Sequence, residues 1–231
     1  MTLRDELAAY AAATHADSWT TVEGRRVPEA DAVPQRNNAV KLDATVLYAD
    51  LAESTQLVKT KKPWFAAEVY KNYLYSAGRI ISSLDGVITS YDGDRVMGVF
   101  IGDSMNTNAA RAALRINYAV TKILMPALQA RYPDSTYQIK QRVGVDTSSR
   151  FIARTGVRGN NDLVWVGNAA NNAAKMAALS KGCTSYISAN VYGMLSKKAK
   201  YASGTDDDMW KDLGTSDLGY RIYGSTYWSS F

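Results

Sequence analysis

Two long stretches of the chain place apolar residues three and four positions apart, a spacing that is typical of helices packed along one face. The first begins at Pro63 and ends before Gly86, with apolar residues recurring along its whole length. The second covers residues 106–131, and Pro126 is expected to kink its end. A shorter stretch with the same spacing, residues 168–182, predicts a third helix that ends at a glycine.

Runs rich in β-branched and aromatic residues predict strands between these helices. Residues 44–51 are predicted to form a buried strand with an acidic residue at its end. Residues 87–91 and 95–101 flank an Asp-Gly-Asp turn, which indicates a tight hairpin. Residues 137–154 are expected to form a β-hairpin of their own, and residues 162–167 a further strand.

The resulting order of elements is strand, helix, strand, strand, helix, strand, which is the ferredoxin-like split βαβ plan. The predicted fold class is therefore α+β, with a βαββαβ core extended by further pieces, including a strand at residues 219–224. Residues 1–40 combine a short helical pattern with a polar stretch and are predicted to be an N-terminal extension. Residues 41–231 are predicted to be one domain, because a chain of 231 residues supports one sizeable core more readily than two.

The net charge and the composition limit the classes of substrate, partner and metal site that fit this chain. The formal net charge of +5 and the pI near 9.1 fit a polyanionic substrate or partner, such as a nucleoside triphosphate or nucleic acid. Cys183 is the only cysteine and His15 the only histidine, so an intrachain disulfide and a multi-histidine metal site are both excluded. The sequence shows neither a secretory signal nor an apolar stretch long enough to span a bilayer, so we expect a cytoplasmic protein without membrane attachment.

Two acidic residues stand at positions where metal chemistry is possible. Asp50 ends the first predicted strand and Asp94 lies in the turn of the following hairpin, so a βαββ arrangement brings them to the same end of the sheet. Carboxylate pairs of this kind bind hard divalent cations, and a pair of such ions can clamp the reacting oxygens of phosphoryl transfer. Aspartates at strand ends and in turns also serve as caps, so the residues alone leave both interpretations open.

Two further pairs of residues are candidates for ligand contacts. Ser54 and Thr55 follow the first strand, where hydroxyls and free backbone N–H groups could hold a triphosphate, or where one hydroxyl simply caps a helix. Asn171 and Lys175 are four positions apart and share one face of the third helix. That spacing is equally typical of an ordinary exposed helix face.

Four motifs, taken together and in order, resemble those of the class III nucleotidyl cyclases. The resemblance covers residues 41–225, and the four motifs are TVLYADLAEST, SYDGDRVMGVF, QRVGVDTSS and VGNAANNAAKM. The sequence around the first motif, KLDATVLYADLAEST, and the N-terminal extension are most similar to those of the pyrimidine cyclases of bacterial Pycsar antiphage systems.

The resemblance implies roles for the candidate residues. Asp50 and Asp94 would bind two divalent metal ions, Mn²⁺ or Mg²⁺, with the carbonyl of Leu51 as a further ligand. Asn171 would orient the ribose, and Lys175, at a position where the family usually has arginine, would steady charge on the phosphate. In such enzymes the two groups of residues come from opposite subunits, so a homodimer is implied.

The positions that read the purine base in related cyclases depart from the family pattern. Ser90 and Val164 stand where adenylate and guanylate cyclases carry their base-reading residues, and Tyr91 adjoins the site, where it could stack on a smaller ring. The resemblance therefore implies a pyrimidine nucleoside triphosphate as substrate: UTP giving cyclic UMP first, with CTP giving cyclic CMP as the alternative. Asp146 replaces a histidine that many relatives carry. A separate effector that binds the cyclic pyrimidine is also implied.

Two other functions compete with the enzyme. A cyclase-like domain without activity could serve as a dimerising or nucleotide-sensing module, but such a domain is expected to have lost at least one of Asp50, Asp94 and Asn171. A nucleic-acid-binding ferredoxin-like domain would fit the basic pI and the many tyrosines. The paired acids on the same face would repel phosphate unless a metal were bound, so no nucleic-acid partner is expected.

Overall fold

The structure is a computed structural model that describes residues 1–157 and 159–231, and it divides into two compact units. The small unit comprises Met1–Asp43 and Ser149–Gly167, and the large unit comprises Ala44–Ser148 and Asn168–Phe231. Two strands, β2 (Asn38–Leu51) and β5 (Gln141–Val157), contribute residues to both units.

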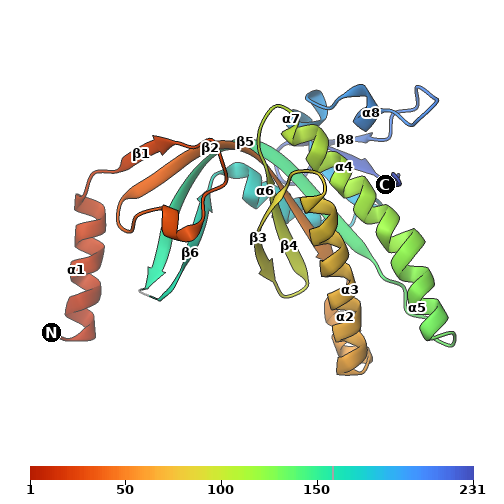
Figure 1. Cartoon of the computed structure of the whole chain (residues 1–231), viewed down its shortest axis with the longest axis horizontal. Coiled ribbons are helices and arrows are strands. Elements are labelled where there is room, and N and C mark those ends of the chain that lie inside the picture. The colour runs from red at the N-terminus through yellow and green to blue at the C-terminus, as the bar shows by residue number, and fades with distance from the viewer. Residues whose placement is uncertain (158) are drawn as a thin grey trace. The chain divides into compact units, whose positions relative to one another are not determined.

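The large unit is built on a sheet in the order β3-β4-β2-β5-β7-β9-β8. Figure 1 shows the hairpin of β3 and β4 and the two long helices α3 and α4 of this unit. Strand β4 pairs antiparallel with both β2 and β3, whereas β5 and β7 run parallel. The remaining strands of this sheet are β3 (Val87–Asp92), β4 (Arg95–Phe100), β7 (Ser185–Ser188), β8 (Lys211–Thr215) and β9 (Arg221–Ser225). The order β2, α3, β3, β4, α4, β5 confirms the predicted α+β class and its ferredoxin-like core.

Helices α3 and α4 bury their apolar faces against one side of this sheet. Leu47, Ala49 and Leu51 alternate along β2 and pack into the same core as α3 and α4, so the residues between them, Tyr48 and Asp50, face the other side. The helices of the large unit are α2 (Ser54–Thr60), α3 (Pro63–Ser82), α4 (Met105–Tyr118), α5 (Met125–Arg131), α6 (Asn168–Ala177), α7 (Ala189–Gly193) and α8 (Lys197–Lys200). In the described part of the chain, no helix is long and apolar enough to cross a membrane.

The second long helix is interrupted ahead of its proline. A π-helical segment, Ala119–Leu124, joins α4 to α5, and Pro126 occupies the first turn of α5. Proline cannot donate to the helical ladder, and a wider π turn is one way in which a helix accommodates a missing donor. The helix is thus locally widened ahead of Pro126, and the predicted kink stays a prediction.

Two expectations about individual elements were wrong. Residues 137–154 do not form a hairpin, because β5 runs without a break to Val157 and pairs antiparallel with β6 (Asn160–Val166) instead. The third helix ends at Ala177 rather than near residue 182, because tight i→i+3 bonds from the N–H groups of Ala178 and Leu179 close it.

The small unit holds the N-terminal helix, α1 (Leu3–Ala16). A capping box at Thr2 begins this helix, and no residue of the helix is buried. The buried amide of Asn37 fixes the end of α1 by donating to the carbonyl oxygens of Thr14 and Asp17 at 2.8 and 2.7 Å. Strand β1 (Thr20–Glu23) runs parallel to the start of β2, and a short 3-10 helix spans Ala30–Ala32. The predicted boundary between an extension and a single domain near residue 40 stays a prediction.

Gly144 allows α6 to lie directly on β5. A Cβ at this position would collide with the backbone carbonyl of Ala173 and approach the backbone nitrogen of Ala177 to 2.7 Å. We expect Gly144→Ala to lower the free energy of unfolding by about 1–3 kcal/mol, because neither clash can be relieved by a side-chain rotation. Urea denaturation measures this change. The control is Gly193→Ala, where nothing lies within 4 Å of the new methyl group, and an equal loss in both variants would contradict close packing at Gly144.

Candidate active site

The pairing of β2 with β4 brings Asp50 and Asp94 together. Asp50 stands opposite Arg95 in the ladder, and the N–H of Leu51 donates to the carbonyl oxygen of Asp94 at 3.4 Å. Gly93, with a φ of 60°, makes the turn that places Asp94 beside the end of β2. The two predicted acids therefore lie together at one end of the β2–β4 ladder.

The Asp50 carboxylate lies in an environment that disfavours its charge. Burial and the nearby charge of Asp94 raise the pKa of Asp50 to about 6, although Arg95, the Leu51 N–H and Arg142 act in the opposite direction. Its Oδ1 atom is buried and has no hydrogen-bond partner in the described structure. A half-buried pair of acids with an unsatisfied oxygen is a site that a cation would stabilise.

Two tyrosines of α3 approach the acid pair. The fully buried Tyr73 donates its hydroxyl to the main-chain oxygen of Asp50 at 3.3 Å. Burial and the charge of Asp94 raise the pKa of Tyr70, whereas a hydrogen bond with the Ser54 side chain lowers it. The sequence pattern placed Tyr73 only on the apolar face of a helix and did not single out Tyr70, so the roles of both hydroxyl groups were missed.

Ser90, at a base-reading position, and its neighbour Tyr91 lie on opposite sides of the sheet at β3. Ser90 pairs with Met97, which pairs with Tyr48, so these three side chains share the face of Asp50. Tyr91 belongs to the other face: a Cβ at Gly78 of α3 would lie 2.6 Å from its hydroxyl oxygen. The ring of Tyr91 therefore packs towards α3, and a contact between Tyr91 and a substrate base stays a prediction.

Arg142 is a cation near the site that sequence reasoning missed. It stands on β5, the strand beside β2, and its charge acts on Asp50, while its guanidinium donates to the Ser180 hydroxyl at 3.2 Å. The alternation with buried Val143 and Val145, which face the helices, was the available signal that Arg142 points to the side of Asp50.

The loop after Asp50 is tied to the neighbouring strand region. Glu53 adopts a left-handed conformation, with a φ of 62°, and forms an ion pair with Lys140 at 2.9 Å. The N–H of Ala52 donates to the carbonyl oxygen of Lys140 at 2.9 Å. Ser54 and Thr55 then begin α2, with Ser54 half-buried and Thr55 exposed.

Helix α6 carries the other candidate residues. Asn171 and Lys175 are both exposed, and no hydrogen bond or ion pair joins them to Asp50 or Asp94 within the described residues. The next residue, Asn172, turns inward and donates to the buried carboxylate of Asp146 at 2.8 Å. Asp146 therefore acts as an acceptor that fixes α6 on β5, a role its sequence position did not reveal.

Val164 is the one candidate that belongs to the small unit. It lies on β6, opposite Ala153 of β5, and its side chain is exposed.

The donors at the acid pair fit a divalent cation. The carboxylates of Asp50 and Asp94 are hard oxygen ligands, and the main-chain carbonyl of Leu51 adjoins them. Throughout the described residues, no group of three or more His, Cys, Asp or Glu side chains is placed to hold a metal ion. The remaining ligands would have to come from water and substrate phosphates, as is usual for Mg²⁺.

Solved structures share this fold. The adenylyl cyclase CyaB from P. aeruginosa matches with a TM-score of 0.64 at 22% identity, over 81% of this chain and 95% of that one. The guanylate cyclase domain of RhGC from Catenaria anguillulae, in complex with GTP, matches with a TM-score of 0.64 at 18% identity, over 82% and 99%. The fold is therefore that of the class III nucleotidyl cyclase catalytic domain.

Sequence relatives narrow the family. The uridylate cyclase of Xanthomonas perforans is 50% identical over 92% of this chain and 91% of its own. The uridylate cyclase of Burkholderia cepacia is 45% identical over 98% of both. No protein-family model matches the sequence. The chain belongs to the uridylate cyclases and is a nucleotidyl cyclase.

The raised pKa of Asp50 predicts that its negative charge destabilises the folded, metal-free protein. In the folded protein the pKa of Asp50 is raised from 3.8 to about 6, so the folded state binds its proton more tightly and the free energy of unfolding falls as the pH rises through this range. We expect Asp50→Asn to stabilise the metal-free protein at pH 8 by about 1–2 kcal/mol after allowance for solvent screening. The gain should shrink as the pH falls from about 6 towards 3.8, because Asp50 is then protonated in the folded protein. Thermal unfolding in a chelator measures it, with exposed Asp103→Asn as the control, and an Asp50→Asn protein less stable than wild type at pH 8 would count against this destabilisation.

Neighbouring asparagines of α6 should behave differently. Asn172→Ala leaves the buried Asp146 carboxylate without its partner, so we expect a loss of about 1–3 kcal/mol in the free energy of unfolding. Asn171→Ala removes an exposed side chain and should change stability by less than about 0.5 kcal/mol. Chemical denaturation of both variants decides the point, and equal losses would be inconsistent with the inward placement of Asn172.

Proposed function

We propose that the chain converts UTP to 3′,5′-cyclic UMP and pyrophosphate, with two divalent metal ions, at sites completed by a homodimer. The observation that carries the proposal is the buried, partnerless oxygen of Asp50 beside Asp94. The choice of UTP is supported by the relatives from X. perforans and B. cepacia, which are named uridylate cyclases.

The residues of the large unit would hold the substrate's triphosphate end. Asp50, Asp94 and the Leu51 carbonyl would hold two Mn²⁺ or Mg²⁺ ions. When bound, such ions lower the proton affinity of the ribose 3′ hydroxyl and neutralise charge on the phosphates. Ser54 and Thr55, which begin α2 shortly after Asp50, would contact the phosphates. Tyr73 keeps the main chain at Asp50 in position through its hydrogen bond.

Arg142 adds a fixed positive charge near the same acids. Its guanidinium is held by Ser180, which limits its movement, and it lies close enough to Asp50 to lower the pKa of that carboxyl. A cation in this place would attract the triphosphate and offset its charge.

The contacts to the ribose and the α-phosphate would come from the other subunit of the dimer. Asn171 and Lys175 are exposed on α6 and make no contact with the acids of their own chain in the described structure. Across a twofold axis, Asn171 would orient the ribose and Lys175 would steady the charge that develops on the α-phosphate. Lysine offers a point charge rather than the two-pronged contact of arginine.

The base would meet small, uncharged residues. Ser90 lies on the face of Asp50, and Val164 stands at the second base position; neither offers the contacts that related cyclases use for purines. Tyr91, expected to stack on the base, has its ring on the other face of the sheet, towards α3, and is given no role in this proposal. Cytosine would fit the same residues as uracil, so CTP conversion to cyclic CMP is the alternative reaction.

The biological setting follows from the product. A cyclic pyrimidine made in the cytoplasm would act as a second messenger for a separate effector in antiphage defence. In this scheme, residues 41–231 form the catalytic domain and residues 1–40 an extension.

Product analysis tests the reaction. Purified protein would be incubated separately with ATP, GTP, CTP and UTP in Mn²⁺, and the products identified by mass spectrometry, beside Asp50→Ala and Asp94→Ala controls. Cyclic UMP that disappears in both controls supports the proposal. Cyclic CMP as the main product would favour the alternative reaction, the conversion of CTP. The absence of a cyclic product from every nucleotide would contradict the proposal.

A mixing experiment tests the shared site. Asp50→Ala and Asn171→Ala should each be inactive alone, because each removes one half of both sites in its dimer. When the two proteins are mixed in equal amounts and allowed to exchange subunits, about a quarter of the wild-type rate should return, since half of the dimers then carry one intact site of two. A coupled pyrophosphate assay follows the rate. Failure of the mixture to recover activity while subunit exchange is demonstrated would argue that each site lies within one chain.

A further inference from the structure

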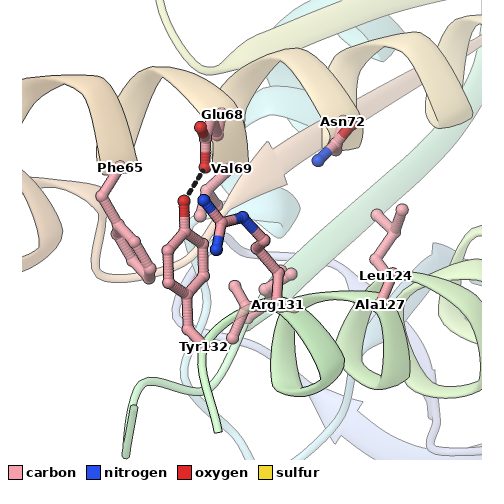
Figure 2. A pocket seen from close by; sticks show the side chains of 10 residues that line it. Phe65, Glu68, Val69, Asn72, Leu124, Ala127, Arg131 and Tyr132 are labelled. Carbon is pink, nitrogen blue, oxygen red and sulfur yellow. Dashed lines mark hydrogen bonds between the residues drawn. The ribbon is translucent and has the colours of Figure 1, made fainter. Parts of the chain in front are cut away.

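An open hollow lies in the large unit between the first turn of α3 and the end of α5. Its volume is about 400 Å³, which is within the usual range for small-molecule sites. A smaller cleft of about 100 Å³ adjoins it and shares Phe65, Arg131 and Tyr132 (Figure 2). The hollow is lined by Lys61, Lys62, Trp64, Phe65, Arg131, Tyr132, Pro133, Asp134 and Ser135.

Aromatic rings form one wall of the hollow. Trp64 is 55% exposed, and its ring lies 6.0 Å from that of Tyr132, which in turn lies 5.2 Å from that of Phe65. The hydroxyl of Tyr132 donates to Glu68 at 2.7 Å, which fixes its ring against α3 (Figure 2). A large exposed ring held by fixed neighbours offers a surface on which a planar ligand can stack.

Positive charge surrounds this wall. Lys61, Lys62 and Arg131 line the hollow together with one acid, Asp134. None of the three cations forms an ion pair with another residue that the structure describes. The guanidinium of Arg131 lies 5.2 Å from the centre of the Tyr132 ring, so cation and aromatic wall are adjacent. A ligand that satisfies these cations must be anionic.

The hollow is separate from the acid pair. Trp64 precedes Tyr73, the residue that contacts Asp50, by nine positions on α3, which corresponds to roughly 13 Å along the helix axis. None of the residues that we assign to the catalytic site lines the hollow.

We propose that this hollow is a second nucleotide site, in which the base stacks on Trp64 and the phosphate lies against Lys61, Lys62 and Arg131. A nucleotide combines the planar ring and the compact anion that the two parts of the hollow select. The substrate triphosphate, the cyclic product and a nucleoside monophosphate share this chemistry.

Fluorine NMR of protein labelled with 5-fluorotryptophan tests the proposal at Trp64 itself. The chain has five tryptophans, and Trp64→Phe assigns the resonance of interest. UTP, cyclic UMP, UMP and inorganic phosphate would be titrated separately in a chelator, so that no metal is held at the acid pair. We expect a saturable shift of the Trp64 resonance with at least one nucleotide, and comparison of the three identifies the source. Inorganic phosphate should cause no comparable shift.

Charge-reversed variants separate binding at the hollow from other effects. Lys61→Glu with Lys62→Glu should weaken nucleotide binding at Trp64 about tenfold or more, which corresponds to at least about 1.4 kcal/mol. The matched control is Lys197→Glu with Lys198→Glu, an exposed lysine pair on α8 that should leave the affinity unchanged. The other four tryptophan resonances report whether each variant remains folded.

Three results would overturn the proposal. They are the absence of a saturable shift with every nucleotide, an equal shift with inorganic phosphate, or an unchanged affinity after Lys61 and Lys62 are reversed. Because binding is read at Trp64 and not from turnover, a chain that made no cyclic nucleotide would leave this test intact.

Discussion

The antiparallel pairing of β2 with β4 holds two carboxylates together in a half-buried place, and the site depends on this forced proximity. The like charge of Asp94 and the loss of water raise the pKa of Asp50 to about 6, and one oxygen of Asp50 has no partner in the described structure. An arrangement that costs folding energy in the absence of a cation is one that a divalent ion relieves. The hydrogen bond from Tyr73 and the Gly93 turn maintain the geometry while the charges oppose it.

A second constraint is the close approach of α6 to β5. Gly144 removes the side chain that would keep the helix away, and the bond between Asn172 and the buried Asp146 fixes the helix in place. In this packing Asn171 and Lys175 are exposed, and within the described residues no hydrogen bond or ion pair joins them to Asp50 or Asp94. Under the roles proposed above, the metal ligands and the ribose and phosphate contacts belong to different elements, which is the physical reason for proposing a dimer.

Much of the fold could be predicted from the sequence, because strong periodicity and turn chemistry specify it locally. The helix beginning at Pro63, the hairpin around Gly93 and the meeting of Asp50 with Asp94 all follow from such signals. The course of β5 was mispredicted because polar residues within it resemble a turn, whereas pairing with β6 keeps the strand extended. Tertiary pairing, which local pattern does not encode, decides such cases.

The parts of the site that escaped prediction depend on which way a side chain faces. Tyr73 was seen as one more apolar helix position, and the alignment of Arg142 with Asp50 depends on two strands being neighbours. Tyr91 was expected at the base, yet the register of β3 turns its ring towards α3, so its contact with substrate stays a prediction.

The proposed reaction requires that Asp50 and Asp94 bind divalent metal ions. Electron paramagnetic resonance of Mn²⁺, in the presence of 3′-deoxy-UTP, which lacks the attacking hydroxyl, counts the ions bound without turnover. We expect two Mn²⁺ ions per chain in the wild-type protein and a loss of this binding in Asp50→Asn. Equal Mn²⁺ binding by the wild-type and Asp50→Asn proteins would contradict it.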